Sequence, residues 1–481
     1  MEGLEIKVGK FSNAFFNKDF RIDSQFYTKE ITKNPNLNYS KIGNFLKKAQ
    51  YGISIGMNEN KIGYPIYRMN EIHNGLCDTE VLKYADISQT ELKIFTLNDR
   101  DILFNRTNSF EWVGRTGLYR KIDSRNFVFA SYLVRLIPDY KVLFPEYLTA
   151  FLNSKFGIND IKRRARQSIN QTNVNPEEVK EIEIPLLSLT FQNTLKDLYE
   201  NAHKKRKISQ DIYSQAENLL LETLGLKDFK PGGENVNVKS FSESFGSSGR
   251  LDAEYYQKKY EDVILKMKGN NYSLLGDLVN IKKSIEPGSS AYSDVGLPFL
   301  RVADYNKFGI SKPQKCLSES YCKENAGLIS RLKPEKGTIL FSKDGSVGTA
   351  FTAKEKMDLV TSGAILHLTV KNCTRILPEY LTLVLNSQLV QMQAERDAGG
   401  SIILHWRISE IENVIIPVVE INIQQKISGL IEESFRLKQQ SEQLLGLAKT
   451  AVEKAIEQGE GEAEDFIHKS LNHDFQDSVI P

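Results

Sequence analysis

The sequence predicts an α+β protein built by tandem duplication, in which each copy is a mostly β domain followed by a long helix. Three observations predict this class. Ten residues recur almost unchanged, as PEYLTAFLNS at 145–154 and PEYLTLVLNS at 378–387. Short apolar runs of strand character precede each of these segments, and a long amphipathic pattern follows each. We expect the two long helices to pair as an antiparallel coiled coil, because the domain between them must turn the chain back.

The repeat extends over most of the chain. RIDSQFY (21–27) resembles RLDAEYY (250–256), and DILFNR (101–106) resembles TILFSK (338–343). The blocks keep the same order in both copies, which indicates two domains of common ancestry. The expected organisation is a mostly β domain at 1–187, a helix at 188–226, a linker at 227–249, a second domain at 250–420, a second helix at 421–457 and a mobile acidic tail at 458–481.

The duplicated PEYLT segment predicts the start of a helix. Pro145 and Pro378 suit the first helical position, where the missing N–H costs nothing. Glu146 and Glu379 suit the positive end of the helix dipole. We interpret this segment as a buried packing helix without chemistry of its own.

Apolar and small residues recur at spacings of three and four in both long helices. Leu195, Leu198 and Ala202 follow this spacing in the first helix, as Ala448, Ala451 and Ala455 do in the second. A helix of ~38 residues spans roughly 57 Å at 1.5 Å per residue. The small side chains allow a second helix to approach closely, although each helix packing on its own domain is the alternative.

The composition predicts a cytoplasmic protein. The chain has 481 residues, a formal net charge of +2 and only four cysteines, none of them in a C-x-x-C pair. Zinc binding is therefore disfavoured, and scattered thiols fit a reducing compartment. We find no apolar signal core and no apolar run of about 18 residues. The near-neutral charge does not decide whether the chain binds nucleic acid.

The common enzyme signatures are missing from the sequence. It contains no phosphate-binding G-x-x-x-x-G-K-[ST], no G-x-G-x-x-G after a strand, no G-x-S-x-G, and no N-P-P-Y or D-P-P-Y. Asp139, Glu178 and Lys180 imitate the acid–acid–lysine set of metal-dependent nucleases, but the second copy has no equivalent lysine. We therefore expect a non-catalytic chain with no metal and no cofactor of its own.

Basic and amide side chains gather in two loop clusters of each copy, at 98–121 and 162–173 and again at 341–351 and 394–409. Such side chains can pair with base edges or hold phosphates, although basic loops are also common as solvated surface. Their recurrence at equivalent places favours DNA binding, while His405 taken alone is more typical of a structural residue. The candidate DNA-binding residues are Arg100, Asn105, Arg106, Asn108, Arg115, Arg163, Arg164, Arg166, Gln167, Lys343, Asp344, Ser346, His405 and Arg407.

The two copies keep their framework and change their loops. RTNSFEWVGR and KDGSVG occupy equivalent places but present different hydrogen-bond donors. One scaffold that reads two different base sequences would need this difference.

Taken together, these motifs resemble the specificity subunit of type I restriction–modification systems. The resemblance covers most of residues 14–457 and rests on ILFNR, ILFSKDGSVG, the PEYLT…LNS pair, and the glutamine-led helices with Gln192 and Gln424. It implies that each copy is a target-recognition domain reading one half of a bipartite, asymmetric site in double-stranded DNA. The helices would act as spacers that hold the half-sites about one turn apart, ~34 Å.

The resemblance also implies partners. Two methyltransferase subunits would flip adenine and use S-adenosylmethionine bound in their own fold, and restriction and motor subunits would complete the complex. The chain itself would catalyse nothing. A recognition module of another defence assembly and a coiled-coil scaffold with two protein-binding modules remain as alternatives. A scaffold would lack salt-dependent affinity for DNA.

Overall fold

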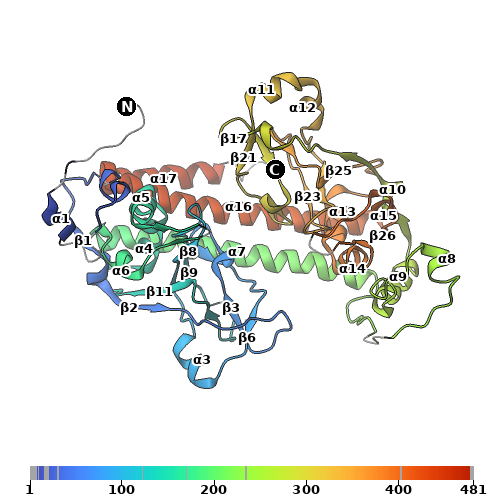
Figure 1. Cartoon of the computed structure of the whole chain (residues 1–481), viewed down its shortest axis with the longest axis horizontal. Helices are drawn as coiled ribbons and strands as arrows, with labels where there is room; N and C mark the ends of the chain where they lie inside the picture. Colours follow the sequence, from blue (N-terminus) through green and yellow to red (C-terminus); the bar gives the residue numbers. More distant parts are fainter. Residues whose placement is uncertain are drawn as a thin grey trace. The chain divides into compact units, whose positions relative to one another are not determined.

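The computed structural model describes residues 8, 10–15, 21–29, 32–121, 123–169, 171–232, 236–400 and 403–476 (Figure 1). The chain forms two compact units. Unit 1 consists of Met1–Ile208 with Leu437–Pro481, and unit 2 consists of Ser209–Arg436. Each unit therefore contains one β-rich region and one part of each long helix. Every helix in this described part is too short or too polar to cross a lipid bilayer.

Unit 1 is built on a six-stranded sheet with the order β2-β11-β7-β9-β5-β4. Smaller sheets have the orders β10-β3-β6, β12-β13-β8 and β1-β14. The main strands are β1 (Tyr39–Lys41), β2 (Leu46–Tyr51), β3 (Tyr64–Tyr67), β4 (Ile72–His73), β5 (Leu76–Cys77), β6 (Tyr84–Ala85), β7 (Ile102–Asn105), β8 (Thr107–Asn108), β9 (Thr116–Leu118), β10 (Val128–Phe129), β11 (Leu133–Pro138), β12 (Arg166–Gln167), β13 (Thr172–Asn173) and β14 (Glu183–Pro185).

Unit 2 repeats the central part of this arrangement in a four-stranded sheet, β16-β25-β22-β23. Further sheets have the orders β17-β21-β18-β24, β15-β26 and β19-β20. The strands are β15 (Tyr272–Leu274), β16 (Val279–Lys283), β17 (Tyr292–Ser293), β18 (Leu297–Leu300), β19 (Tyr305–Asn306), β20 (Gly309–Ile310), β21 (Lys315–Leu317), β22 (Ile339–Ser342), β23 (Ala350–Thr352), β24 (Val360–Thr361), β25 (Ile365–Val370) and β26 (Ile415–Pro417).

The strand pairing confirms the tandem duplication. The order β2-β11-β7-β9 in unit 1 matches β16-β25-β22-β23 in unit 2. The register also matches, since Tyr39 pairs with Pro185 in one copy and Tyr272 pairs with Pro417 in the other. The shorter helices are α1 (Phe11–Phe15), α2 (Ser24–Thr28), α3 (Gln89–Phe95), α4 (Pro145–Asn153), α5 (Lys155–Arg164) and α6 (Pro176–Lys180) in unit 1, and α8 (Phe245–Ser248), α9 (Lys258–Lys268), α10 (Leu275–Leu278), α11 (Glu319–Glu324), α12 (Ala326–Leu332), α13 (Pro378–Asn386), α14 (Gln388–Asp397) and α15 (Ile408–Glu412) in unit 2.

The PEYLT segments form the buried helices α4 and α13, as predicted, with proline in the first turn. A buried glutamine caps each of them. The side chain of Gln192 accepts from the backbone N–H of Phe144 at 2.8 Å, and that of Gln424 accepts from Leu377 at 3.0 Å. Because the first N–H groups of a helix lack intrahelical partners, each glutamine ties the start of the packing helix to the following long helix. The glutamine in the first turn of each long helix therefore has a structural role.

The long helices are α7 (Leu189–Thr223) and α16 (Ile421–Gln458), close to the predicted bounds. In unit 1, Ser441 Oγ donates to the carbonyl of Ala202 at 2.7 Å, and Lys205 Nζ donates to Gln440 Oε1 at 2.8 Å. Residue numbers rise along α7 as they fall along α16, so the helices are antiparallel there. This confirms the predicted pairing within unit 1.

In unit 2, the same two helices meet at a pair of buried serines. Ser209 Oγ donates to the carbonyl of Ser434, and Ser434 Oγ donates to the carbonyl of Ser209, both at 2.7 Å. A side chain can reach the backbone of the other helix in both directions only where the helices lie close together. The prediction that small residues allow close approach is confirmed at this crossing.

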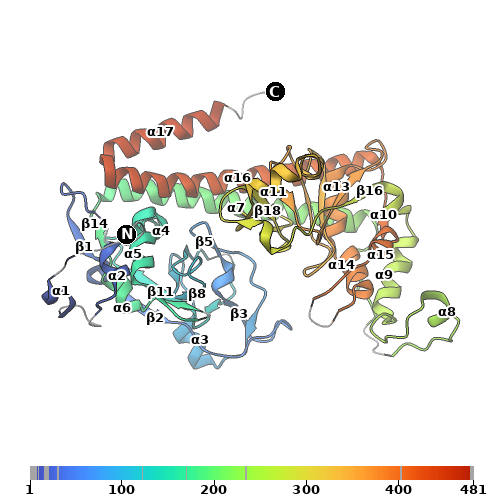
Figure 2. The ribbon, with the colours of Figure 1, turned by 45° about the horizontal axis from the view of Figure 1, so that its top comes forward.

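The predicted mobile tail is wrong for most of its length. Residues Glu460–Gln476 form a further helix, α17, and Figure 2 shows it running back from the end of α16. The chain reverses at Gly459, whose φ of +100° favours glycine. Ala463 and Ile467 are buried in the core of unit 1. The acidic composition concealed these apolar positions; residues 477–481 lie outside the described residues.

The predicted linker at 227–249 contains some local structure. It includes the short helix α8, and the rings of Phe241 and Phe245 stack with centroids 5.4 Å apart. Residues 233–235 of this linker lie outside the described residues. The domain boundaries themselves stay predictions.

Candidate nucleic-acid interface

A small sheet joins the two basic clusters of unit 1. Strand β8 follows Arg106 directly and pairs with β13, which in turn pairs with β12 at Arg166–Gln167. The backbone N–H of Val174 donates to the carbonyl of Arg106 at 2.9 Å. We call residues 106–108, 166–167 and 172–174 the platform of unit 1. It brings together side chains that lie about sixty positions apart in the sequence.

Unit 2 has an equivalent platform, formed by Gly399 and residues 343–345 and 404–406. The backbone N–H of Trp406 donates to the carbonyl of Lys343 at 2.8 Å, as Val174 does to Arg106. His405 and Gly399 exchange backbone hydrogen bonds of 2.7 and 3.1 Å. The two basic clusters of the second copy therefore also meet, through the same backbone pairing as in the first copy.

The two platforms carry different side chains at the same register. In unit 1, the hydroxyl of Thr107 donates to the Asn173 carboxamide oxygen. In unit 2, Asp344 and His405 are paired at these positions, with 2.9 Å between Asp344 Oδ1 and His405 Nδ1. Asp344 and His405 are among the DNA-binding candidates that the sequence predicts, whereas Thr107 and Asn173 are not. Asn173 could have been identified from its alignment with His405, and Thr107 from its alignment with Asp344.

Arg106 and Lys343 directly follow the equivalent strands β7 and β22. The Arg106 guanidinium lies 5.1 Å from the ring centroid of Tyr51, and its buried Nε has no hydrogen-bond partner in the described part of the chain. Lys343 pairs with Asp344. The sequence-based alignment of these two cations is confirmed, while their contact with DNA stays a prediction.

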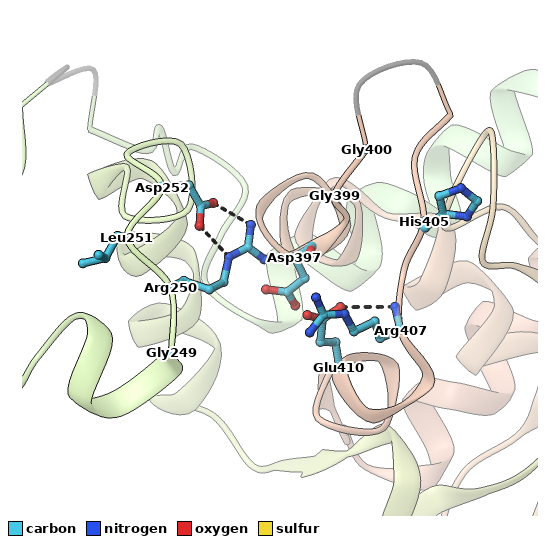
Figure 3. Close-up of a pocket in the computed structure, with 10 residues that line it drawn as sticks. All are labelled: Gly249, Arg250, Leu251, Asp252, Asp397, Gly399, Gly400, His405, Arg407 and Glu410. Atoms are coloured by element: carbon cyan, nitrogen blue, oxygen red, sulfur yellow. Dashed lines mark hydrogen bonds and ion pairs between the residues drawn. The ribbon is translucent and has the colours of Figure 1, made fainter.

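The exposed cations and amides of the platforms are best placed for a ligand. Arg166 and Gln167 are exposed on β12 of unit 1. In unit 2, His405 of the platform and Arg407, which lies just after it in the chain, line a hollow of about 480 Å³. Figure 3 shows Arg250 and Asp252 on the opposite side of this hollow. The backbone N–H of Arg407 donates to Glu410 at 3.1 Å, so its peptide is fixed at the start of α15.

Arg100 is held inside unit 1 by the packing helix. Its guanidinium donates to both carboxylate oxygens of the fully buried Glu146, at 2.8 and 2.7 Å. Burial opposes the charge, but the ion pair with Glu146 keeps the pKa of Arg100 above its ordinary value. Arg100 also has a φ of +68°, a conformation that few side chains adopt. These contacts give Arg100 a structural role, and its contact with DNA stays a prediction.

Arg163 and Arg164 also have partners within unit 1. Arg163 lies 4.5 Å from the ring centroid of Phe26 and pairs with Asp160 at 2.5 Å. Arg164 pairs with Asp160 at 3.0 Å and with Glu178 at 2.8 Å, and all three side chains are almost fully buried. These contacts give Arg163 and Arg164 a structural role, and their contact with DNA stays a prediction.

The arginines of the repeated RIDSQFY and RLDAEYY segments each form a clamp, for which the sequence carries no prediction. Arg21 donates to the carbonyl of Arg164, the last residue of α5, at 2.8 Å. Arg250 donates to the carbonyl of Asp397, the last residue of α14, at 2.9 Å. Each arginine also pairs with the acid two positions later in the chain. The recurring arginine therefore fastens the RIDSQFY segment to the end of α5 and the RLDAEYY segment to the end of α14.

The remaining candidates differ in their exposure. Asn105 is fully buried and donates to the carbonyl of Trp112 at 3.4 Å, and Arg115 lies 3.4 Å from the Trp112 ring centroid. Burial lowers the pKa of Arg115 to about 10. Asn108 accepts from the N–H of Ser109 at 2.8 Å, and Ser346 is exposed. Asn105 is thus placed in the core, whereas Asn108 and Ser346 lie at the platform edge.

Lys162 fixes the loop that carries Trp112. Its ammonium group donates to the carbonyls of Phe110, Glu111 and Val113, the last two at 2.9 and 3.0 Å. Burial lowers the pKa of Lys162 to about 8. The sequence predicts Lys162 only as a member of a basic cluster, whereas in the structure this lysine positions the loop.

The acids and lysine that imitate a nuclease set are separately partnered. Glu178 pairs with Arg164 at 2.8 Å, Asp139 with Lys47 at 3.0 Å, and Lys180 with Glu177 at 2.6 Å. No cluster of three or more potential metal ligands occurs among the described residues. The three side chains therefore serve in local ion pairs.

Residues 267–445 match the family model of the type I restriction modification DNA specificity domain. The match covers less than half of the chain, and it is in this part that the chain is similar to type I restriction–modification specificity proteins. The chain is 30% identical over 145 residues to the EcoKI specificity subunit of Escherichia coli, which is 30% of each chain. It is 28% identical over 179 residues to the putative MjaX specificity subunit of Methanocaldococcus jannaschii, which is 36% of this chain and 42% of that protein. The matches thus span less than half of these relatives.

Solved structures of the family also align with the chain. The S subunit of a type I system from M. genitalium aligns at 15% identity over 89% of this chain and 98% of that chain, with a TM-score of 0.39. The HsdS subunit from Thermoanaerobacter tengcongensis aligns over the same shares at 15% identity, with a TM-score of 0.29.

Proposed function

We propose that this chain is the DNA-specificity subunit of a type I restriction–modification complex. Each β-rich unit reads one half of a bipartite site in double-stranded DNA. The observation that carries the proposal is the pair of platforms, which share one backbone arrangement and differ in the side chains they present. The family match over residues 267–445 supports the same reading for the second copy.

The exposed side chains of the platforms suit DNA. Arg166 and Gln167 on β12 can hold phosphates or pair with guanine and adenine edges. His405 and Arg407 offer comparable chemistry in unit 2. Because phosphate contacts fix position while base contacts carry sequence information, both kinds are needed in each half-site.

Catalysis would belong to the partners. Two methyltransferase subunits would bind S-adenosylmethionine in their own fold and modify adenine, and restriction and motor subunits would add cleavage. These partners act in the cytoplasm, where the DNA is. In this arrangement α7 and α16 fix the gap between the half-sites, since long paired helices bend little compared with loops.

Titration of the full chain with a fluorescent random-sequence duplex at rising salt tests the proposal. Displacement of counterions from phosphates predicts that the logarithm of the association constant falls linearly with the logarithm of the salt concentration. A coiled-coil scaffold whose two modules bind only protein would show no such affinity. Absence of salt-dependent binding by the full chain, alone and with its methyltransferase, would contradict the proposal.

A further inference from the structure

The paired side chains at the centre of each platform are not needed to join its strands. In unit 1 the β8–β13 pairing and the Val174 to Arg106 hydrogen bond already connect the backbone. In unit 2 the bridge between Asp344 and His405 and the Trp406 to Lys343 hydrogen bond do the same. The side chains at this register are therefore free to differ between the copies, and they do.

In unit 1 the Thr107 hydroxyl orients a carboxamide. It donates to Asn173 Oδ1, which places the Nδ2 amino group on the other side of the amide. Thr107 is buried, and Asn173 is half-buried. The amide therefore retains two donors and one acceptor lone pair. This combination matches the N7 acceptor and N6 donor that adenine presents in the major groove.

In unit 2 the Asp344 carboxylate orients an imidazole. A carboxylate can only accept, so a ring that carries a single proton holds it on His405 Nδ1, 2.9 Å from Asp344 Oδ1. Nε2 then carries a lone pair and is an acceptor. The His405 side chain is 66% exposed, whereas that of Asp344 is 19% exposed. An outward acceptor matches the amino group of cytosine or adenine.

We propose that these pairs are specificity-determining positions, each reading one base pair of its own half-site. The Thr107–Asn173 pair reads adenine in one half, and the Asp344–His405 pair reads an amino-bearing base, cytosine or adenine, in the other. The inference rests on the proposed function and adds to it the residues and the hydrogen-bond pattern at one defined position. Thr107 and Asp344 are positioning residues, and Asn173 and His405 touch the base.

Exchange of the pair tests the inference. In the full chain, Thr107→Asp with Asn173→His gives unit 1 the chemistry of unit 2. Sequencing of the duplexes retained from a random-sequence library, with the methyltransferase present, reports both half-sites. We expect the preference of one half-site for adenine over the other bases to fall by at least about fivefold at a single base pair. The other half-site and the gap should be unchanged.

A matched control uses a second hydroxyl–amide pair of unit 1. Asn44 Nδ2 donates to Ser40 Oγ at 3.1 Å, and Asn44 is exposed on the turn Ile42–Phe45, outside the platform. Ser40→Asp with Asn44→His should leave both half-sites unchanged. If the exchanged platform fails to fold, the single variant Asn173→Ala still tests the claim, because it should relax the preference at one base pair only.

The outcomes separate the inference from the proposed function. If the wild-type chain selects no bipartite site, the proposed function fails. If the wild type selects one and both the exchange and Asn173→Ala leave it unchanged, the inference is overturned. Equal weakening for all duplexes, with no change in preference, also overturns it, since that result would make the pair a structural contact.

Discussion

At the scale of single residues, comparison of the two copies distinguishes positions that serve the fold from positions that vary. The clamp formed by Arg21 with Asp23 recurs as Arg250 with Asp252, and the cap formed by Gln192 recurs as Gln424. The platform pairs are instead replaced. A residue that keeps both its identity and its contacts in the two copies serves the fold, whereas a position that keeps only its backbone contacts is available for recognition.

The glutamine caps predict a large effect of a small substitution. Gln192 is almost fully buried, accepts from the Phe144 N–H and donates to the carbonyl of Leu187 at 2.9 Å. Gln192→Ala leaves these buried groups unpaired, so we expect the free energy of unfolding to fall by about 1–3 kcal/mol. Urea denaturation followed by circular dichroism measures this. Asn193→Ala, at the exposed neighbouring position, is the control, and equal effects of the two variants would contradict the capping role.

His367 predicts a dependence of stability on pH. Burial lowers its pKa from 6.5 to about 4 in the folded protein, and Lys282 adds to the effect. Between these values the unfolded chain binds a proton that the folded chain does not, so stability should fall as the pH drops from 6.5 to 4. The contribution is at most about 3 kcal/mol. We expect His367→Gln to reduce this loss in denaturation measured across that pH range. If His367→Gln loses as much stability as the wild type between pH 6.5 and 4, His367 does not contribute to the pH dependence of stability.

At the scale of elements, long and strongly patterned segments could be predicted from the sequence. The PEYLT helices and the two long helices have their periodicity within one segment, and they appear close to the expected bounds. The platforms could not be predicted, because β8, β12 and β13 have two residues each and β8 precedes its partner β13 by more than sixty positions. Strands this short carry no periodicity, so only the comparison of the two copies could reveal them.

The helix α17 was missed because charge concealed its buried face. Ala463 and Ile467 lie four positions apart and are buried, while acidic residues fill much of the sequence around them. We expect Ile467→Asp to destabilise unit 1 by several kcal/mol, since it places an unpaired charge in the core. Thermal unfolding of the full chain measures this. Lys469→Asp alters the exposed side of the same helix, and a comparable loss from this control would contradict the packing of α17.

At the scale of the whole molecule, the proposed function makes the paired helices α7 and α16 the spacer between the two half-sites. Removal of residues 202–208 from α7 and 434–440 from α16 shortens each helix by seven residues. The contact of Ser209 with Ser434 and that of Ser441 with Ala202 are then replaced by one contact between Ser209 and Ser441. The helices become ~10 Å shorter, so we expect the gap to shorten by at most about three base pairs. Selection from a random duplex library should return the same half-sites. An unchanged gap would contradict the spacer role.

The most direct test of the central claim is the adenine methylome of the host that encodes this chain, compared with a strain from which the chain has been deleted. We predict that the deletion removes one methylation motif, composed of two unlike half-sites separated by a fixed gap. Identical methylomes in a host with an active methyltransferase, or the loss of a continuous or palindromic motif, would contradict the claim that two unlike platforms read one divided site.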